Sequence, residues 1–410
     1  MGAAKNFDAI IIGGGASGLA AAVTYLRRPD AGALLLIEAK EECGRKILAT
    51  GNGRCNVSNL SADGFEDIEV FFESLGVLFR VEEMGRVYPM SGKASSVRDA
   101  LVYALGHTPG QAAAYPAPTG KSTEKGKPMT LSVVRRPSAA TVEVQVGRRV
   151  ASVEKSADGV FSVKDGEGRV SRARHVLIAT GGKAGPAFGS YGDGYAFARA
   201  FGHKIETIHP SLVPLAYAEE EREALSRLKG VRARVGASLE IDGWYTTGAD
   251  GEVQFTADAL SGIVIFDIST AMPKSIIEGK PSVCVRLDLV PGAKKEELQE
   301  MMRLHDGFWL EGVMDKRLSD WIVERGKGDI ERIALYAKCL SVPISGTKGW
   351  KDAQVTRGGV VLDEVSPRTG ESRLCPGLFF AGEVLDEDFV CGGFHLSQAW
   401  TTGMRAGAHL

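Results

Sequence analysis

The chain has 410 residues, of which 44% are hydrophobic and 24% are charged, and this composition excludes a largely disordered protein. The 49 basic and 51 acidic residues give a formal net charge of −2, which argues against a strongly basic nucleic-acid-binding protein. We do not expect an integral membrane protein, because no apolar run approaches the roughly 18 residues that a membrane-spanning helix needs.

The first forty residues have the pattern of a dinucleotide-binding unit. An apolar run at residues 7–12 predicts a buried parallel strand, and it leads directly into a G-x-G-x-x-G motif at residues 13–18. A helix is predicted from Ala16 to about Arg28, then a strand over Ala33–Ile37 that ends in Glu38. A pyrophosphate binds at such a helix N-terminus, and the acid accepts hydrogen bonds from the adenosine ribose, which disfavours NADP. The residues assigned to this site are Gly13, Gly15, Ala16, Ser17, Gly18, Glu38, Ala39 and Lys40.

Residues 44–59 are dense in glycine, asparagine and arginine. Such a run predicts an extended loop that wraps an anionic or polar cofactor. Cys55 is also a candidate catalytic residue, because the neighbouring Arg54 can lower the pKa of its thiol, although a small packing residue is the alternative. The cofactor residues predicted in this loop are Gly44, Arg45, Lys46, Gly51, Asn52, Gly53, Arg54, Cys55 and Asn56.

The middle of the chain contains several segments with different sequence patterns. Residues 107–137 are rich in Pro, Gly, Ser, Thr and Lys and predict a surface excursion. Strands are expected at 141–146 and 149–155, and a hairpin at 161–170. An apolar strand then ends in small residues that let a backbone approach the cofactor. These residues are Ala179, Thr180, Gly181 and Gly182.

Residues 212–289 have strand-like patterning, with turn signals at Asp242-Gly243 and Asp250-Gly251, which indicates an inserted β domain. Residues 294–340 have helical periodicity. Near the C-terminus, Leu378–Ala381 predicts another strand, and ligands bind at the carboxyl ends of such strands.

Several of these segments resemble the BaiN/YhiN-type flavoproteins, a family with a glutathione-reductase-like FAD fold. The blocks that carry the resemblance are Gly44–Asn59, Gly85–Pro89, Lys93–Ser95, Val176–Gly182, Gly192–Tyr195, Pro376–Asp386 and Gly392–Leu396. The resemblance implies an α/β fold, in which a Rossmann-like FAD-binding domain with a parallel sheet is interrupted by a β-barrel-like domain that carries a small helical insertion.

The expected FAD-binding domain comprises residues 1–205 and 356–410. The inserted β domain comprises residues 206–292 and 341–355, and the helical insertion comprises residues 293–340. The resemblance also implies further cofactor residues, namely Val150, Gly382, Glu383, Asp386, Gly393, Phe394, His395 and Leu396. A helix from about Leu396 to His409 would direct its N-terminal amides at the flavin and stabilise the negative charge of its reduced form.

Two residues depart from the family pattern. His395 replaces the usual Asn of the G-G-Y-N-L block, and Cys391 stands where the family commonly has Thr. Both are candidate catalytic residues near the flavin. The alternatives are a hydrogen bond from His395 to a flavin carbonyl or to the backbone, and a small buried apolar role for Cys391.

We therefore expect an FAD-dependent oxidoreductase that transfers hydride between a non-covalently bound flavin and a small organic substrate. No second G-x-G-x-x-G follows residue 100, so NAD(P)H would reduce the flavin by transient docking. The six cysteines form no C-x-x-C pair, and we expect no metal site. Because we find no secretory signal, a cytoplasmic location is expected.

Three alternatives stay open at this point. Some relatives in the family are amine or aminoketone oxidases that return electrons to oxygen. The chain can also be a non-catalytic flavin-binding redox module. A flavoenzyme that acts on tRNA is disfavoured by the net charge, but the pairs Arg135-Arg136 and Arg148-Arg149 form a basic cluster that favours it.

Overall fold

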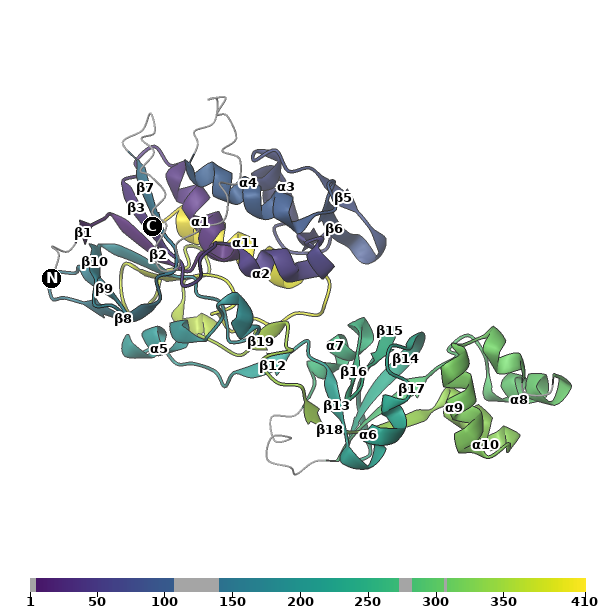
Figure 1. The fold of residues 1–410 in the computed structure, drawn as a ribbon. Coiled ribbons are helices and arrows are strands. Elements are labelled where there is room, and N and C mark those ends of the chain that lie inside the picture. Colours follow the sequence, from purple (N-terminus) through teal and green to yellow (C-terminus); the bar gives the residue numbers. More distant parts are fainter. Residues whose placement is uncertain (1–4, 107–139, 273–281, 306–307) are drawn as a thin grey trace, which may run out of the picture. The chain divides into compact units, whose positions relative to one another are not determined.

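The computed structural model describes residues 5–106, 140–272, 282–305 and 308–410. The chain divides into two compact units. Unit 1 comprises residues 1–208 and 356–410, and unit 2 comprises residues 209–355 (Figure 1). The predicted surface excursion at residues 107–137 lies outside the described residues.

Unit 1 is built on a parallel five-stranded sheet with the order β20-β11-β2-β3-β7. Every residue of β2 is buried, as are four of the five residues of β3. Both faces of a parallel sheet are covered, which requires such unbroken Ile and Leu runs. The strands predicted from these runs are confirmed. The five strands are β2 (Ala9–Ile12), β3 (Ala33–Ile37), β7 (Thr141–Gln145), β11 (His175–Ile178) and β20 (Leu378–Phe380).

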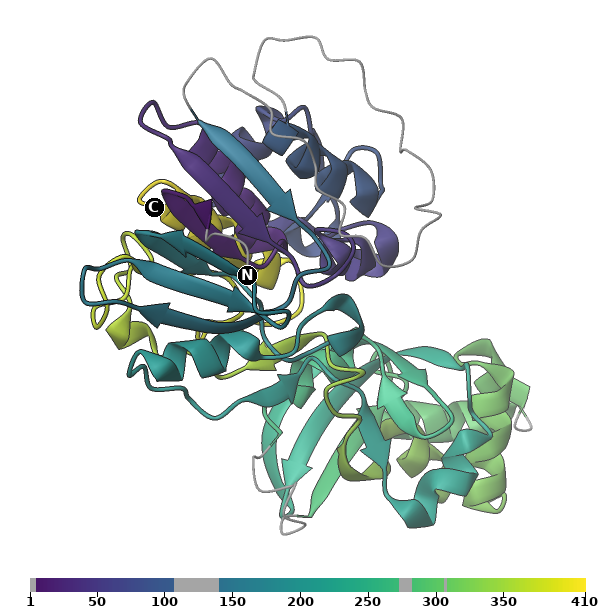
Figure 2. The same ribbon diagram turned by 60° about the vertical axis from the view of Figure 1, so that its left-hand side comes forward.

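The first and last helices of unit 1 pack directly against each other. In Figures 1 and 2 the purple N-terminal elements and the yellow C-terminal helix lie side by side. A Cβ atom at Gly403 would overlap the Ser17 carbonyl oxygen, and one at Gly407 would overlap the Ala21 carbonyl oxygen. Small residues at this contact therefore bring the C-terminal helix onto the start of the chain. The helices of unit 1 are α1 (Ala16–Leu26), α2 (Arg45–Ala49), α3 (Phe65–Glu73), α4 (Ala94–Gly106), α5 (Asp193–Ala200) and α11 (Phe394–Gly407).

Two smaller sheets flank this framework. The hairpin predicted at residues 161–170 is confirmed as an antiparallel pair in a sheet with the order β1-β10-β9-β8. Its strands are β1 (Lys5–Asn6), β8 (Val150–Lys155), β9 (Phe161–Asp165) and β10 (Val170–Ala173). A three-stranded sheet contains β4 (Ser58–Asn59), β6 (Arg86–Pro89) and β5 (Phe79–Val81). Short 3₁₀ turns are η1 (Thr50–Gly53), η2 (Glu83–Gly85), η3 (Pro186–Phe188) and η6 (Leu362–Glu364).

The prediction of an extended loop over residues 44–59 is wrong in its first part. Gly44 adopts a left-handed φ of 73°, and α2 then begins at Arg45. Helix-forming residues occupy this turn, and the buried Ile47 side chain anchors it to the core of unit 1. The segment is therefore a short helix and a 3₁₀ turn.

Unit 2 contains a closed barrel with the order β13-β16-β15-β14-β17-β18. Its core is filled by side chains such as those of Tyr217, Phe255 and Val285, all fully buried. The barrel strands are β13 (Leu215–Tyr217), β14 (Arg232–Ile241), β15 (Trp244–Phe255), β16 (Ala259–Ser261), β17 (Val283–Asp288) and β18 (Leu340–Thr347). Two short strands, β12 (His209–Ser211) and β19 (Val355–Arg357), complete the strands of the described chain.

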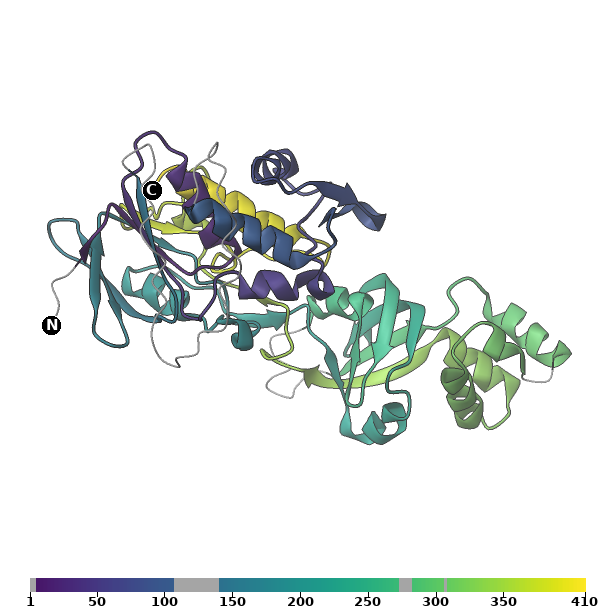
Figure 3. The ribbon, with the colours of Figure 1, turned by 45° about the horizontal axis from the view of Figure 1, so that its top comes forward.

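The helical periodicity at residues 294–340 is confirmed. Three helices lie at one end of the barrel (Figures 1 and 3), and α10 contacts β17 and β18. The helices of unit 2 are α6 (Glu219–Ser226), α7 (Ile263–Ser269), α8 (Lys295–Leu304), α9 (Lys316–Gly326) and α10 (Ile330–Lys338), with a 3₁₀ turn η5 at Phe308–Gly312. Within the described residues, no helix is both long enough and apolar enough to span a membrane.

Of the two turns predicted in unit 2, one is confirmed and one is wrong. Asp242 and Gly243 have φ angles of 53° and 81° and join β14 to β15, as in a two-residue hairpin turn. Asp250-Gly251 instead lies inside β15, where Asp250 pairs with Gly236 of β14. Pairing along a long hairpin here overrides the local turn preference.

Candidate functional site

The glycine turn between β2 and α1 combines close packing with open space. A Cβ atom at Gly13 would overlap the Ala179 carbonyl oxygen, and one at Gly18 would overlap the Gly13 carbonyl oxygen. A Cβ atom at Gly15, by contrast, would meet nothing within 4 Å. Gly15 is the N-cap of α1, which has neither a side-chain cap nor an acidic residue in its first turn. An uncapped helix N-terminus beside open space fits an anionic group such as a pyrophosphate.

Glu38 lies beside this turn, as predicted from its place after β3. Its Oε2 accepts a hydrogen bond from the Gly14 N–H at 2.8 Å, and its Oε1 accepts one from the Lys40 N–H at 2.8 Å. Burial raises the pKa of the Glu38 carboxyl, while these backbone donors oppose the shift. The acid and the glycine turn thus form one site at the carboxyl end of the sheet.

An ion pair joins helix α2 to the C-terminal part of unit 1. Lys46 Nζ donates to Glu383 Oε2 at 2.7 Å and to the Ala184 carbonyl oxygen at 3.3 Å. The Thr356 N–H donates to Glu383 Oε1 at 2.8 Å, and the Thr356 hydroxyl accepts from the Lys183 and Ala184 N–H groups. Two predicted residues, 337 positions apart in the sequence, therefore meet. Thr356 was missed, because nothing near it in the sequence marks it.

A buried oxygen without a hydrogen-bond partner among the described residues, Asn56 Oδ1, lies beside the N-terminus of α11. Gly393, its N-cap, has a φ of 103°, and a Cβ atom there would overlap the Ser58 carbonyl oxygen and lie 3.0 Å from Asn56 Oδ1. Asn56 Oδ1 is buried and has no hydrogen-bond partner in the described structure. Because an unpaired buried oxygen is costly, a donor from a bound group fits here. The predicted residues of both chain ends come together at this point.

His395 lies in the first turn of α11 and already has protein partners. Its Nε2 accepts from the Phe389 N–H at 3.3 Å and lies 3.5 Å from Asp388 Oδ1. Asp388 Oδ2 lies 3.6 Å from Arg357 Nε. A neutral His395 that accepts at Nε2 carries its proton on Nδ1, whereas a protonated Nε2 faces the Asp388 carboxylate. Asp388 was missed by sequence analysis, since only the fold places it beside His395.

The structure favours the alternative interpretation of Cys55, a small packing residue, over an activated thiol. Its side chain is fully buried, and burial raises its pKa to about 12, because a thiolate is poorly solvated there. Arg54 does not offset this effect, since its guanidinium pairs with Glu82 and lies 4.2 Å from the centre of the Tyr88 ring. Cys391, the other candidate thiol, is partly buried.

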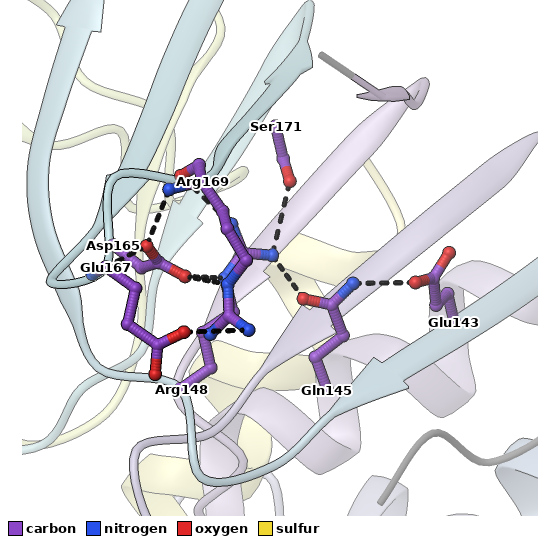
Figure 4. A network of polar contacts seen from close by, with 7 residues as sticks. All are labelled: Glu143, Gln145, Arg148, Asp165, Glu167, Arg169 and Ser171. Carbon is purple, nitrogen blue, oxygen red and sulfur yellow. Dashed lines mark hydrogen bonds and ion pairs between the residues drawn. The ribbon is translucent and has the colours of Figure 1, made fainter. Parts of the chain in front are cut away.

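Arg148 is the centre of a buried polar network (Figure 4). Its Nε donates to Asp165 Oδ2 at 2.7 Å, and the two side chains are only 4% and 2% exposed. The same guanidinium donates to Gln145, to the Ser171 hydroxyl and to the Arg169 carbonyl oxygen. The backbone N–H of Arg148 donates to the Glu38 carbonyl oxygen at 2.8 Å. The network is therefore joined to the candidate site through the backbone of Glu38.

This burial bears on the predicted basic cluster. Arg148 cannot contribute to a surface for a nucleic acid, and the Arg149 guanidinium makes two hydrogen bonds to Asp193 at 2.8 and 2.7 Å. Arg135-Arg136 lies outside the described residues. The part of the cluster that the structure describes therefore does not form a free basic surface.

The other predicted cofactor residues lie along the same segments, and their contacts with a cofactor stay predictions. Ser17, in the first turn of α1, donates to the Ala381 carbonyl oxygen, and Gly382 packs against its side chain. Arg45 pairs with Glu41 at 3.4 Å. The remaining residues by position are Ala16 in α1, Ala39 after β3, Gly44 before α2, Gly51, Asn52 and Gly53 in η1, Val150 at the start of β8, Ala179, Thr180, Gly181 and Gly182 after β11, Asp386 after β20, and Phe394 and Leu396 in α11. In the described parts of the chain, no group of three or more His, Cys, Asp or Glu residues is arranged to hold a metal ion.

Three kinds of comparison relate the chain to known proteins. The model of the HI0933-like protein Rossmann domain matches residues 120–409. A 3-dehydro-bile acid delta(4,6)-reductase of Clostridium scindens is 33% identical, over 97% of this chain and 97% of its own. A ribosomal RNA dihydrouridine synthase of Escherichia coli is 27% identical, over 97% of this chain and 96% of its own. Among solved structures, the open conformation of a flavocytochrome c3 fumarate reductase has a TM-score of 0.48 at 14% identity, and the match covers 99% of this chain and 78% of that one.

Proposed function

The chain belongs to the HI0933-like family with a Rossmann domain, and from this premise we propose that it reduces an electron-poor carbon–carbon double bond in a small organic substrate. The resemblance to BaiN/YhiN-type flavoproteins is confirmed by the family match and by the reductase relative. The chain is a flavin-dependent oxidoreductase. Its flavin is FAD, held without a covalent bond, and NAD(P)H is the electron donor that docks transiently.

The observation that carries the proposal is the relative that matches this chain over almost its whole length at 33% identity. Its name describes a reductase that acts at the delta(4,6) positions of a 3-dehydro bile acid. The second relative makes dihydrouridine, a uridine with two added hydrogens. Both names describe saturation of a carbon–carbon double bond, so the reaction class is shared although the substrates differ.

The residues of the site fit a flavin dinucleotide. The N-terminus of α1 beside Gly15 would hold the pyrophosphate, Glu38 would accept from the ribose, and Asn56 Oδ1 would accept from a ring N–H. The N-terminal amides of α11 would favour negative charge on the ring. When bound, the flavin supplies hydride transfer, and the protein supplies orientation and electrostatics.

Saturation of a double bond consumes a proton as well as a hydride, and His395 is the proton donor in this proposal. Its ring is 19% exposed and faces the Asp388 carboxylate through Nε2. An imidazole positioned beside the reacting carbon can act as a general acid. Asp388 would orient the ring.

An anaerobic titration tests the proposal. NADH or NADPH should bleach the flavin absorbance at about 450 nm. An α,β-unsaturated ketone such as a 3-oxo-Δ4 steroid should then restore this absorbance, with formation of the saturated ketone. No bleaching by either nicotinamide, together with reduction by amines, would favour the oxidase alternative. Bleaching without reoxidation by any alkene would favour a non-catalytic redox module.

A ribosomal RNA substrate is the second candidate, because the Escherichia coli relative also spans almost the whole chain. The net charge of −2 and the buried Arg148 disfavour it. The dihydrouridine content of ribosomal RNA after incubation with the enzyme and NADPH distinguishes the two substrates.

The six cysteines are all free thiols, which supports a reducing, cytoplasmic compartment.

A further inference from the structure

Tyr191 lies in the segment that joins β11 to α5, and two cations contact its ring. Lys40 Nζ lies 5.2 Å from the ring centre, and the Arg149 guanidinium carbon lies 4.3 Å from it. Asp193 holds Arg149 in place through two hydrogen bonds. Tyr191 belongs to no sequence motif and has no part in the proposed hydride or proton transfer.

Three separate segments meet at this ring. Lys40 lies two residues after Glu38 at the end of β3, Arg149 directly precedes Val150 of β8, and Tyr191 directly precedes Gly192, the N-cap of α5. Backbone hydrogen bonds fix the first two segments to each other, since the Gly147 N–H donates to the Lys40 carbonyl oxygen at 2.7 Å.

The segment that carries Tyr191 also packs against Glu38 itself. Gly189 has a φ of 104°, and a Cβ atom there would lie 3.1 Å from Lys40 Cγ and 3.7 Å from Glu38 Oε1. The segment that carries Tyr191 therefore passes beside the carboxylate that would bind the ribose, and the Tyr191 ring contacts Lys40, two residues after that carboxylate. In an adenosine the base is attached to that ribose, so the base must lie within a few ångströms of the carboxylate.

The geometry points to Tyr191 as the residue that stacks on the adenine of the flavin dinucleotide, with Lys40 and Arg149 fixing its ring. This inference rests on the proposed flavin function. A purine presents a flat π-surface, and base–aromatic stacking contributes substantially to binding. The two cations hold the electron-rich ring in place through cation–π attraction. Tyr191 thereby adds to the preference for FAD over FMN that Glu38 already gives, because FMN lacks the adenosine.

The alternative is that Tyr191 only anchors its own segment. FAD and FMN separate the two roles, because they share the isoalloxazine, the ribityl chain and one phosphate and differ in the adenosine monophosphate half. A stacking residue affects binding of FAD alone. A residue that merely supports the fold affects both ligands and also the melting temperature.

The test measures dissociation constants of FAD and FMN by flavin fluorescence on the full chain after removal of its flavin. We expect Tyr191→Ala to weaken FAD binding about 10- to 100-fold and to change FMN binding less than about twofold. Tyr191→Phe keeps the ring and should bind FAD like the wild type. Tyr245→Ala, an exposed tyrosine on the β14–β15 hairpin of unit 2, is the matched control and should change neither constant.

Equal losses of FAD and FMN affinity in Tyr191→Ala would overturn the inference, and so would unchanged FAD affinity. Failure of the proposed function looks different, because the wild-type chain would then bind neither flavin.

Discussion

The glycine turn at residues 13–18 and the segment at residues 388–396 belong to the same candidate site but are shaped by different parts of the chain. The first is shaped by backbone, since Gly13 and Gly18 have no room for a Cβ atom. The second is shaped by side chains, since His395 depends on Asp388, and Asp388 in turn faces Arg357. A local sequence pattern can specify the first kind of site, whereas the second depends on which distant residues the fold brings together.

The largest effect is expected in the glycine turn at residues 13–18. Gly18→Ala forces a methyl group into the Gly13 carbonyl oxygen, so we expect a loss of about 3 kcal/mol in the free energy of unfolding and no detectable FAD binding. Gly15→Ala is the matched control, because its methyl enters open space. It should change stability by less than about 0.5 kcal/mol and weaken FAD binding. Equal destabilisation by both substitutions in chemical denaturation would contradict this view of the turn.

The buried network behind Glu38 should be nearly as sensitive. Among the described residues, Arg148→Met leaves Asp165 with the partly exposed Arg169 as its one cationic partner, and we expect a loss of about 3 kcal/mol in urea unfolding. Arg149→Met removes a pair whose arginine is 55% exposed, and it should cost no more than about 1 kcal/mol. Similar losses for both variants would show that burial is not what makes the Arg148 pair important.

The same network predicts a dependence of stability on pH. Burial alone would raise the pKa of Asp165, but hydrogen bonds from Arg169 and Arg148 outweigh it and hold the pKa below its usual value. A lowered pKa in the folded state stabilises the protein above the unfolded pKa, near 4. Wild-type stability should therefore fall as the pH drops through the lowered folded value, and Arg148→Met should show a shallower fall. Identical pH profiles for the two proteins would refute this assignment.

Substitutions in the segment at residues 388–396 should change the turnover rate rather than the stability of the protein. His395→Asn restores the residue that is usual in the family block, so folding and FAD affinity should be kept. We expect kcat for alkene reduction to fall about 100-fold, as for loss of a general acid, and this implies that relatives with Asn at this position take their proton from another group. Asp388→Asn should lower kcat less, because Asp388 acts only by orienting the ring. An unchanged kcat in His395→Asn would remove His395 from the mechanism.

The smallest effect is expected at Cys55. Because burial raises the pKa of its thiol to about 12, iodoacetamide at pH 8 should leave Cys55 unmodified in the native protein, as peptide mass spectrometry would show. Cys55→Ala should keep kcat within about twofold of the wild type. Rapid alkylation of Cys55 would restore the activated-thiol interpretation.

Much of the framework could be predicted because its signals are local. Continuous apolar runs identified β2 and β3, and the spacing from the glycine turn identified Glu38, whose carboxylate indeed meets the Gly14 N–H. The failures occurred where tertiary context decides. Asp250-Gly251 resembles a turn but pairs along a long hairpin. The burial of Cys55 also depends on packing that its neighbours in the sequence do not reveal.

The residues that sequence analysis missed share one property. Thr356, Asp388 and Tyr191 carry no motif, and their partners lie far away in the chain or across loops. Thr356 meets Glu383 and the backbone of residues 183 and 184 only after the C-terminal strand joins the sheet. The parts of the site that depend on side chains from separate segments could therefore be identified only from the fold.

The central claim is that this fold holds a flavin dinucleotide, and the bound cofactor can be measured directly. The purified full chain should be yellow, and heat denaturation should release one FAD per chain into the supernatant, identified by chromatography against FAD and FMN standards. A colourless chain that takes up no FAD on incubation would contradict the account. Flavin that stays with the denatured polypeptide would contradict non-covalent binding.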